Sequence, residues 1–220
     1  IINNKIEQER LASVPNKNVY VVDTSSKYYV KSLNFLKLDR TFFINEPTIH
    51  PLGFKEVNIV TSRGCIFNCA FCAAAYGQNK NFGIRERSID SVREELKGIK
   101  NNSKNVSSIR VLDDLFLKSK RHIKYAIDVF KPFDFSWRSM AHVQTFKGVF
   151  LEDIVQLKQS GCEELFIGVE SGSPKILKSI NKTSNVDVIL NNLTNVLKAG
   201  IAIKAYFIYG FPDETLEDME

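Results

Sequence analysis

The chain has 220 residues, of which 44% are hydrophobic and 25% are charged, and its net charge is +5. This length and composition suit one globular domain of moderate size, and no run of 18 or more apolar residues occurs, which argues against a transmembrane helix. The basic excess is spread without a block of five like charges, so it does not indicate a nucleic-acid-binding surface, although nucleic acid stays among the partners to be considered.

The cysteines and the first residues indicate a compartment. Residues 1–15 lack the basic-then-apolar pattern of a secretory signal. Four cysteines in such a chain argue against a disulfide framework, and we expect a cytoplasmic protein without a membrane span. Three of the cysteines fall within eight residues, a density that is typical of metal binding.

The two ends of the chain differ from its middle. Residues 1–50 are irregular and rich in Asn and Lys, so we expect an N-terminal extension or linker there and the main domain at residues 51–220. The first residue is Ile, and residues 213–220 are acidic like the first turn of a helix that has just begun. We interpret the sequence as a fragment of a longer protein.

From Val57 onward, apolar strand-like runs alternate with helical patterns. Strands are predicted at residues 57–60, 108–112, 133–137, 164–169 and 203–209. Helices are predicted at 88–100, 120–130, 151–157, 173–180 and 186–197, where apolar residues recur on one face. Repeated strand–helix units predict an α/β fold with a parallel sheet, either doubly wound or an unfinished barrel. In both folds, ligands bind at the carboxyl ends of the strands.

The most informative motif is Cys65-x3-Cys69-x2-Cys72, which follows the first predicted strand directly. Three thiolates on one loop can hold three irons of a cubane iron–sulfur cluster, which usually takes four cysteines, so one iron would stay open. A structural zinc site is an alternative, but such sites add a second pair of cysteines or nearby histidines, and the three histidines here are scattered. Cys162 precedes a predicted strand, so we expect it at the opposite end of the sheet as a buried apolar residue.

The cysteine motif after a first strand resembles the radical S-adenosylmethionine (SAM) superfamily, and residues 56–216 resemble its core along most of their length. The resemblance implies a partial (β/α) TIM-type barrel, with about five of six parallel strands present and the barrel truncated at its C-terminus. It also implies that Cys65, Cys69 and Cys72 bind a [4Fe–4S] cluster whose open iron binds SAM. Reduction by flavodoxin or ferredoxin would then cleave SAM to a 5′-deoxyadenosyl radical that abstracts hydrogen from a substrate.

The resemblance assigns cofactor contacts to other strand ends. Residues 168–173 are similar to the family segment that contacts the SAM ribose or amino acid part, which implies roles for Glu170 and Ser171. Residues 208–212 are similar to the adenine segment, which implies roles for Ile208 and Gly210, with Asp213 or Glu214 as the following acid. Phe71 is expected to pack on the cluster or on adenine.

Two more charged residues are expected at strand ends. Asp113 ends the second predicted strand, where it would bind the SAM ammonium, accept a hydrogen bond from the substrate or cap a helix. Arg138 is expected to end the third strand, where it would pair with the SAM carboxylate, with an anionic substrate or with a structural acid. No catalytic residue is assigned beyond the cluster.

The residues within and around the motifs suggest a branch of the superfamily. Arg63-Gly64-Cys65, residues 169–173 and Gly210-Phe211-Pro212 are similar to the group that includes cobalamin-dependent radical SAM enzymes and tRNA methylthiotransferases, and residues 38–51 resemble the linker after a cobalamin-binding domain. This implies cobalamin-dependent methyl transfer to a small-molecule or peptide substrate, with the cobalamin site outside this chain. Methylthiolation of RNA is the alternative, although residues 1–64 lack the second cysteine cluster that it would need. The non-enzymatic alternative is an electron-transfer module with a fourth ligand.

Overall fold

The computed structural model of the chain describes residues 11–13, 20–22, 30–35, 40, 48–49, 53, 55–76, 82–102, 105–183 and 185–220. The chain divides into two compact units, Ile1–Lys31 and Ser32–Glu220. In the first unit, β1 (Leu11–Ser13) pairs antiparallel with β2 (Tyr20–Val22). The domain boundary expected at residue 50 stays a prediction, and the linker-like residues 38–51 lie mostly outside the described residues.

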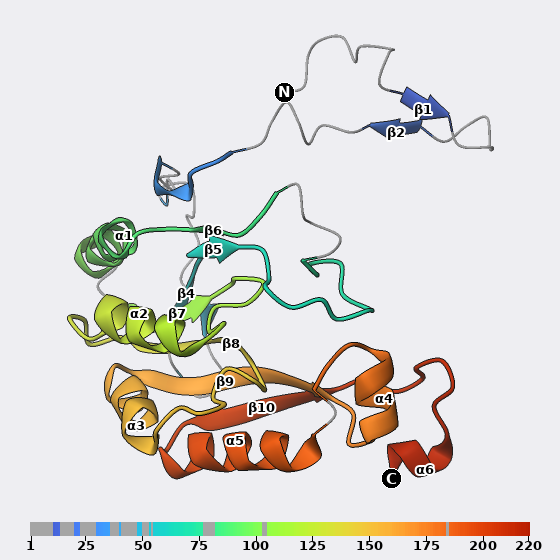
Figure 1. The fold of residues 1–220 in the computed structure, drawn as a ribbon. Helices are drawn as coiled ribbons and strands as arrows, with labels where there is room; N and C mark the ends of the chain where they lie inside the picture. The colour runs from blue at the N-terminus through green and yellow to red at the C-terminus, as the bar shows by residue number, and fades with distance from the viewer. Residues whose placement is uncertain are drawn as a thin grey trace. The chain divides into compact units, whose positions relative to one another are not determined.

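The second unit is built on a six-stranded sheet (Figure 1). Its strands, in spatial order, are β10 (Ala202–Phe207), β9 (Cys162–Glu170), β8 (Ser136–His142), β7 (Ser108–Val111), β4 (Lys55–Ile59) and β3 (Thr48–Ile49). All neighbours pair in parallel except β3, which runs antiparallel to β4. The five parallel strands confirm the predicted α/β class.

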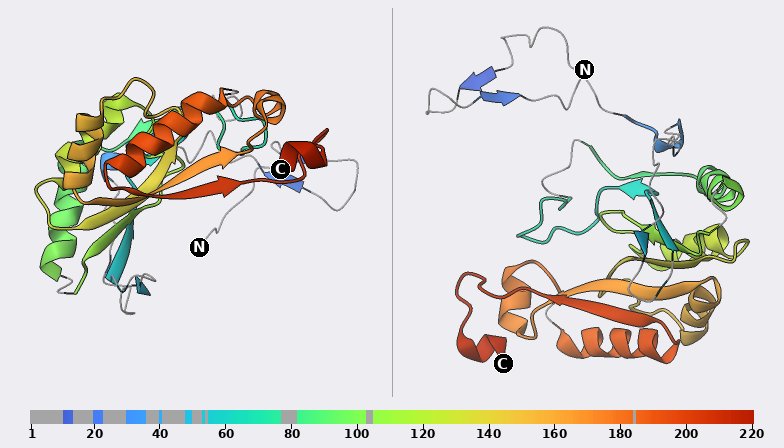
Figure 2. Two further views of the ribbon diagram at one scale, coloured as in Figure 1. Left: turned by 90° about the horizontal axis from the view of Figure 1, so that it is seen from below. Right: turned by 180° about the vertical axis from the view of Figure 1, so that it is seen from behind.

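Four helices lie along one face of this sheet (Figures 1 and 2): α1 (Ile89–Asn102), α2 (Lys120–Phe130), α3 (Leu151–Gln159) and α5 (Val186–Lys198). The parallel strands follow one another in chain order, and the described helices between them stay on the same side. A doubly wound sheet reverses its strand order and places helices on both faces. The arrangement is therefore of the barrel type, which the sequence pattern alone had not decided.

The core lies between the helices and the sheet. On α2, Ile123, Ala126 and Phe130 are buried at helical spacing, as predicted. On β8, every second residue from Trp137 is buried against the helices, and the Trp137 indole stacks on Phe130 with ring centres 4.8 Å apart. The two periodicities of the sequence thus bury one stripe of each helix against one face of the sheet.

The third strand differs from its prediction at residues 133–137. Phe133 and Phe135 do not belong to a strand; they pack into the core from the connection that follows α2. The strand begins at Ser136 and runs to His142. A short aromatic run is typical of both a strand and a buried turn, so the apolar pattern of residues 133–137 predicted the start of the strand too early.

The turn between α3 and β9 requires a glycine. Gly161 has φ +100°, and a Cβ there would lie 2.2 Å from the carbonyl oxygen of Phe135. Cys162 follows as the first residue of β9 and is fully buried, which confirms its predicted place at the far end of the sheet.

The remaining elements are short. They are the 3-10 helix η2 (Leu33–Phe35), the ribbon of β5 (Ser62–Arg63) with β6 (Arg85–Glu86), and the helices α4 (Pro174–Ser179) and α6 (Leu216–Met219). None of the helices in the described residues has the length and apolar character needed to cross a membrane.

Candidate cofactor site at the cysteine loop

The cysteine loop, residues 64–76, connects β5 to the segment that precedes β6. Cys65, Cys69 and Cys72 are free thiols and are half-buried. The N–H of Cys72 donates to the carbonyl of Cys69 at 3.1 Å, and the N–H of Ala75 donates to the carbonyl of Cys72 at 3.1 Å. The first turn lies between Cys69 and Cys72, and the second bends the backbone directly after the last thiol.

Two carboxylates at the end of β7 hold the entrance to the cysteine loop. Asp113 is buried and accepts from the Thr61 N–H at 2.7 Å, the Thr61 hydroxyl at 2.5 Å and the Ser62 hydroxyl at 2.7 Å. Asp114 accepts from the Gly64 N–H at 2.7 Å. Asp113 therefore ties the end of β7 to Thr61 and Ser62, and its expected role toward SAM stays a prediction.

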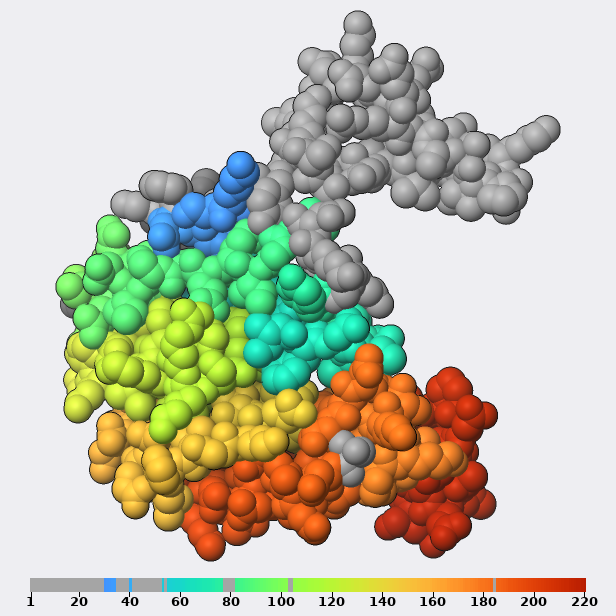
Figure 3. Space-filling view, viewed as in Figure 1, coloured from blue at the N-terminus to red at the C-terminus, as the bar shows by residue number. Residues whose placement is uncertain are grey.

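The far side of the cysteine loop contacts two later segments (Figure 3). The N–H of Ala70 donates to the carbonyl of Ile180, just after α4, at 3.0 Å, and the Phe71 ring lies 5.7 Å from the Phe211 ring, just after β10. In the space-filling view, the blue-green cysteine loop lies next to the orange segment that contains α4. The placement of Phe71 on the cluster or adenine stays a prediction.

His142, at the carboxyl end of β8, is a member of the site that the sequence did not reveal. Its ring stacks on Phe67 of the cysteine loop, with centres 3.6 Å apart and planes 15° apart. Burial, reinforced by the positive charge of Lys182, lowers the pKa of His142 to about 3, so the ring is neutral at pH 7. Its Nδ1 accepts from the Gln144 N–H at 3.1 Å.

Glu170 and Lys182 form a buried ion pair at the end of β9. The Lys182 Nζ lies 2.7 Å from the Glu170 Oε1, and the two side chains are 3% and 10% exposed. Glu170 has φ +71°, an uncommon conformation for a residue with a Cβ. Its side chain folds back over Gly168, where a Cβ would lie 2.1 Å from the Glu170 Oε1. The resemblance assigns Glu170 to SAM, and that role stays a prediction; no sequence motif pointed to Lys182.

The positive charges of Lys118 and Lys182 favour the thiolate form of two of the cysteines. Burial raises the pKa of Cys65 and Cys69, while the charge of Lys118 opposes this shift at Cys65 and that of Lys182 opposes it at Cys69. Iron and zinc bind the thiolate, so these cations help the loop to accept a metal. Within the described residues, no group of three His, Cys, Asp or Glu converges on a single ion. A cubane does not need such convergence, because each cysteine binds its own iron.

The other predicted SAM residues lie at the ends of β9 and β10. Ser171 is buried, and its hydroxyl accepts from the Ser173 N–H at 3.1 Å. The Ile208 N–H donates to the carbonyl of Glu170 at 3.0 Å, which ties the two strand ends together. Gly210 has φ +87°, and its N–H donates to Glu214.

The acid left undecided after β10 now has a definite geometry. The Glu214 carboxylate accepts from the N–H groups of Gly210 and Phe211. Asp213 has φ +64° and contributes its carbonyl oxygen to Lys175 at 2.7 Å. Glu214 is therefore the acid that shapes the turn around Gly210.

The position expected for Arg138 is wrong. Arg138 is the third residue of β8, and the strand continues to His142 before it reaches the cysteine loop. Its guanidinium donates to both oxygens of Glu56, at 2.6 and 2.7 Å, and to Glu164 at 3.1 Å. Burial lowers the pKa of Arg138, but these two carboxylates outweigh it and raise the pKa overall. Arg138 is a structural ion-pair residue, and His142 occupies the strand end instead.

Comparison with known proteins agrees with this geometry. Residues 59–220 match the family model described as the radical SAM superfamily. An uncharacterized methyltransferase of Pyrococcus horikoshii is 35% identical over 165 residues, which are 74% of this chain and 34% of that protein. A bacteriochlorophyllide d C-12(1)-methyltransferase of Chlorobaculum tepidum is 28% identical over 80% of this chain and 38% of its own length. The chain thus spans about a third of the length of these relatives.

A solved structure shows the same fold. It is that of the cobalamin-dependent SAM radical enzyme OxsB with aqua-cobalamin and SAM bound, with a TM-score of 0.64, 22% identity, and coverage of 74% of this chain and 25% of OxsB. The cysteine loop after the first parallel strand and the barrel-type strand order fit this likeness. The family model covers well over half of the chain, and the chain belongs to the radical SAM superfamily.

Proposed function

We propose that this chain carries the catalytic core of a radical SAM enzyme. In this proposal Cys65, Cys69 and Cys72 hold three irons of a [4Fe–4S] cluster and leave the fourth iron to SAM. The cluster and SAM supply, when bound and reduced by a partner such as flavodoxin or ferredoxin, a 5′-deoxyadenosyl radical that abstracts hydrogen from the substrate.

The chain's own residues bind, orient and shield these groups. Asp113 and Asp114 fix the entrance to the cysteine loop, and the stack of Phe67 on the neutral His142 fixes its middle. The buried Lys182 and Glu170 present one positive and one negative group beside the loop, which suits the carboxylate and the hydroxyl or ammonium groups of SAM. Ser171, Ile208 and Gly210 complete the proposed SAM contacts.

One observation carries the proposal: the end of β8 and the segments that follow β7, β9 and β10 all contact the cysteine loop. The loop follows β4 and β5. It donates hydrogen bonds to Asp114 after β7 and to Ile180 after α4, and its rings contact His142 at the end of β8 and Phe211 after β10. A cofactor held by the thiols would therefore lie at the carboxyl ends of the strands, where barrel enzymes bind their ligands.

The finer reaction that we propose is cobalamin-dependent methyl transfer, with cobalamin bound outside this chain. Two of the relatives are named as methyltransferases, and the neighbouring structure OxsB holds cobalamin. Methylthiolation of RNA is the second candidate, and it would require a further cysteine cluster elsewhere in the protein. Both reactions use the same cluster and SAM site, so the site residues do not separate them.

The test uses the full-length protein, reconstituted anaerobically with iron and sulfide and reduced with dithionite. Addition of SAM is expected to release 5′-deoxyadenosine, measured by chromatography, and to change the electron paramagnetic resonance spectrum of the reduced cluster. A matched Cys69→Ala protein is the control and should release none. If the cluster is intact but SAM neither changes its electron paramagnetic resonance spectrum nor yields 5′-deoxyadenosine, the chain is an electron-transfer module instead.

A further inference from the structure

The face of the sheet that points away from the helices carries charged side chains in register. Cα partners in a parallel sheet share a face, and the pairings align Asn58, Arg110, Arg138 and Glu164 in one row across β4, β7, β8 and β9. Phe166 and Lys204 are partners in the next row. We call this surface the inner face. None of the helices that the structure describes covers it (Figure 2).

The two arginines of this row are partnered differently. Arg138 takes both carboxylates of the neighbourhood, Glu56 and Glu164. Arg110 is its direct neighbour across the strands, and within the described part of the chain no ion pair or hydrogen bond reaches the Arg110 guanidinium. Like charges in directly opposed positions repel, so Arg110 sits at a position that an added negative charge would stabilise.

An aromatic platform positions the Arg110 guanidinium. Its central carbon lies 5.3 Å from the ring centre of Phe166, and Arg138 lies at the same distance from that ring. Phe166 is buried at 3% exposure beneath these groups, whereas Arg110 is half-buried. Contact with a ring orients a planar guanidinium and leaves its N–H donors available for two parallel hydrogen bonds to a carboxylate or phosphate.

The surrounding charge also favours an anion. These two rows hold three cations, Arg110, Arg138 and Lys204, and one carboxylate, Glu164; Glu56 adds a second carboxylate from the preceding row, and both carboxylates are bound to Arg138. Phe166 precedes Glu170 by four residues on β9. A strand rises about 3.3 Å per residue, so the Phe166 position, over which the Arg110 guanidinium lies, is roughly 13 Å along the strand from Glu170. That separation leaves room for a substrate between them.

We propose that Arg110, seated on Phe166, binds an anionic group of the substrate, a carboxylate or a phosphate, on the inner face of the sheet. The proposal rests on the proposed radical SAM function, which places the substrate beside the cysteine loop. It makes Arg110 a residue that selects an acidic substrate and sets how far its anionic group lies from the reacting end.

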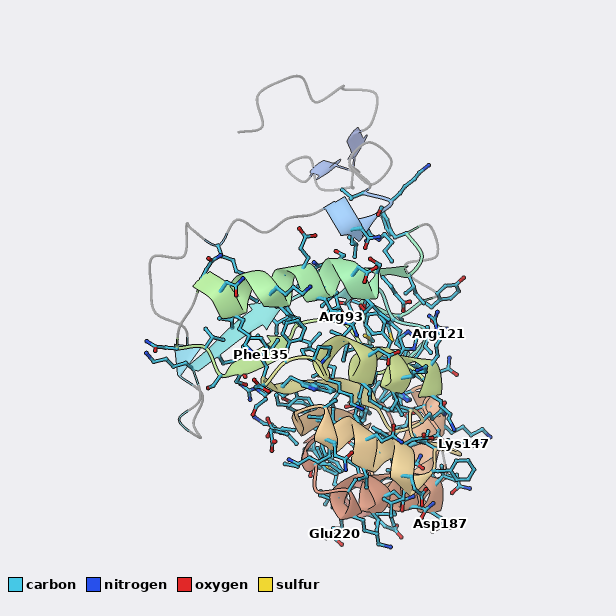
Figure 4. All side chains as sticks on the ribbon, turned by 90° about the vertical axis from the view of Figure 1, so that its left-hand side faces the viewer. Arg93, Arg121, Phe135, Lys147, Asp187 and Glu220 are labelled. Atoms are coloured by element: carbon cyan, nitrogen blue, oxygen red, sulfur yellow. The ribbon has the colours of Figure 1, made fainter. Side chains whose placement is uncertain are left out.

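The test is a binding titration with the full-length, cluster-loaded protein in the presence of SAM. Inorganic phosphate is followed by phosphorus NMR, and acetate, in a separate arm, by competition or by carbon-13 line broadening; the two arms distinguish a phosphate from a carboxylate. Arg110→Gln is expected to raise the dissociation constant of the preferred anion at least tenfold. Arg121→Gln is the matched control, because Arg121 is 76% exposed and lies on the outer helix α2 (Figure 4).

Two further variants keep the proposal testable if Arg110→Gln folds poorly. Arg110→Lys keeps the positive charge but loses the two parallel N–H donors of the guanidinium, so it should weaken anion binding less than Arg110→Gln. Phe166→Leu keeps the charge but removes the platform, so it too should weaken binding. Equal anion binding in the wild type and Arg110→Gln overturns the proposal, and a lower melting temperature of the variant in that case would mean that Arg110 contributes to stability alone. Loss of 5′-deoxyadenosine release with intact anion binding would instead count against the proposed function alone.

Discussion

At the residue scale, the ion pair of Glu170 and Lys182 shows how one backbone position fixes a charge. Glu170 takes a left-handed backbone conformation, and its carboxylate folds over Gly168 to reach Lys182. Both ends of the pair are buried, so removing either would leave an unpaired buried charge, a costly change. Gly168 matters because it has no Cβ, and the Glu170 carboxylate occupies the place where a Cβ would lie.

Gly168→Ala should therefore displace the Glu170 carboxylate. The new Cβ would lie 2.1 Å from Oε1, and such overpacking costs about 1–3 kcal/mol. We expect a lower melting temperature and at least tenfold weaker SAM binding, measured by calorimetry and titration. Gly172→Ala is the matched control for stability, because a Cβ there would meet nothing within 4 Å. Equal melting temperatures for the two variants would contradict this account.

Substitution of each cysteine by alanine should distinguish the three proposed cluster ligands from Cys162. Burial raises the pKa of Cys162 well above its usual value, so this thiol stays protonated at the far end of the sheet. Cys162→Ala should keep the full iron content and lose about 1 kcal/mol of stability. Cys65→Ala, Cys69→Ala or Cys72→Ala should each lose the cubane absorbance. Iron loss in Cys162→Ala without unfolding would make Cys162 a ligand.

At the scale of elements, the β5–β6 ribbon joins the cysteine loop to α2. Glu86 of β6 accepts from His122 and forms ion pairs with Lys118, at 3.3 Å, and with Arg121. Lys118 in turn donates to the Ser62 hydroxyl of β5 at 2.8 Å. One carboxylate thus links the start of a helix to the strand pair that carries the thiols.

The pH dependence of stability should report this link. The hydrogen bond from His122, aided by Lys118 and against the opposing effect of burial, lowers the pKa of Glu86 to about 2 from 4.5. A lowered folded-state pKa adds stability above pH 4.5, and this stability disappears as pH falls from 4.5 towards 2. The melting temperature of Glu86→Gln should therefore lie below that of the wild type above pH 4.5 and approach it near pH 2.

The exposed Glu152, at the start of α3, provides the comparison for this experiment. Glu152 forms no ion pair within the described residues, so Glu152→Gln should lower the melting temperature at neutral pH less than Glu86→Gln does. A gap between Glu86→Gln and the wild type that stays constant down to pH 2 would show that the Glu86 contribution is not electrostatic.

Helix positions were predictable here, and the ends of strands were less so. The apolar spacing of residues 120–130 predicted α2 with its observed bounds, because one buried stripe must face the sheet. The β8 strand was shifted by three residues at its start, since Phe133 and Phe135 are buried without belonging to a strand. Because the strand starts and ends later than predicted, Arg138 lies within β8 and His142, rather than Arg138, lies at the strand end beside the cysteine loop. Contacts such as that of His142 with Phe67 depend on tertiary packing, which no local pattern encodes.

At the scale of the whole second unit, the site is assembled from distant parts of the chain. The thiols come from residues 65–72, the ion pair from residues 170 and 182, and the turn with Gly210 from the segment after β10. The motifs revealed the thiols, Glu170 and Gly210 separately but not Lys182, and the parallel strand order explains why these parts meet. A ligand that bridges these parts must stabilise all of them together.

Hydrogen exchange of the full-length, cluster-loaded protein provides the test of this assembly. A ligand at 100 times its dissociation constant stabilises the folded state by about 2.7 kcal/mol, and the effect is largest where the ligand holds segments closed. SAM should therefore slow amide exchange in residues 65–76, 168–182 and 208–214 at the same time, and leave the outer part of α1 unchanged. Protection confined to one of the three segments would show that SAM does not bridge them. The cluster-free Cys69→Ala protein should show no coordinated protection, because the thiol loop then lacks the group that joins SAM to the strand ends.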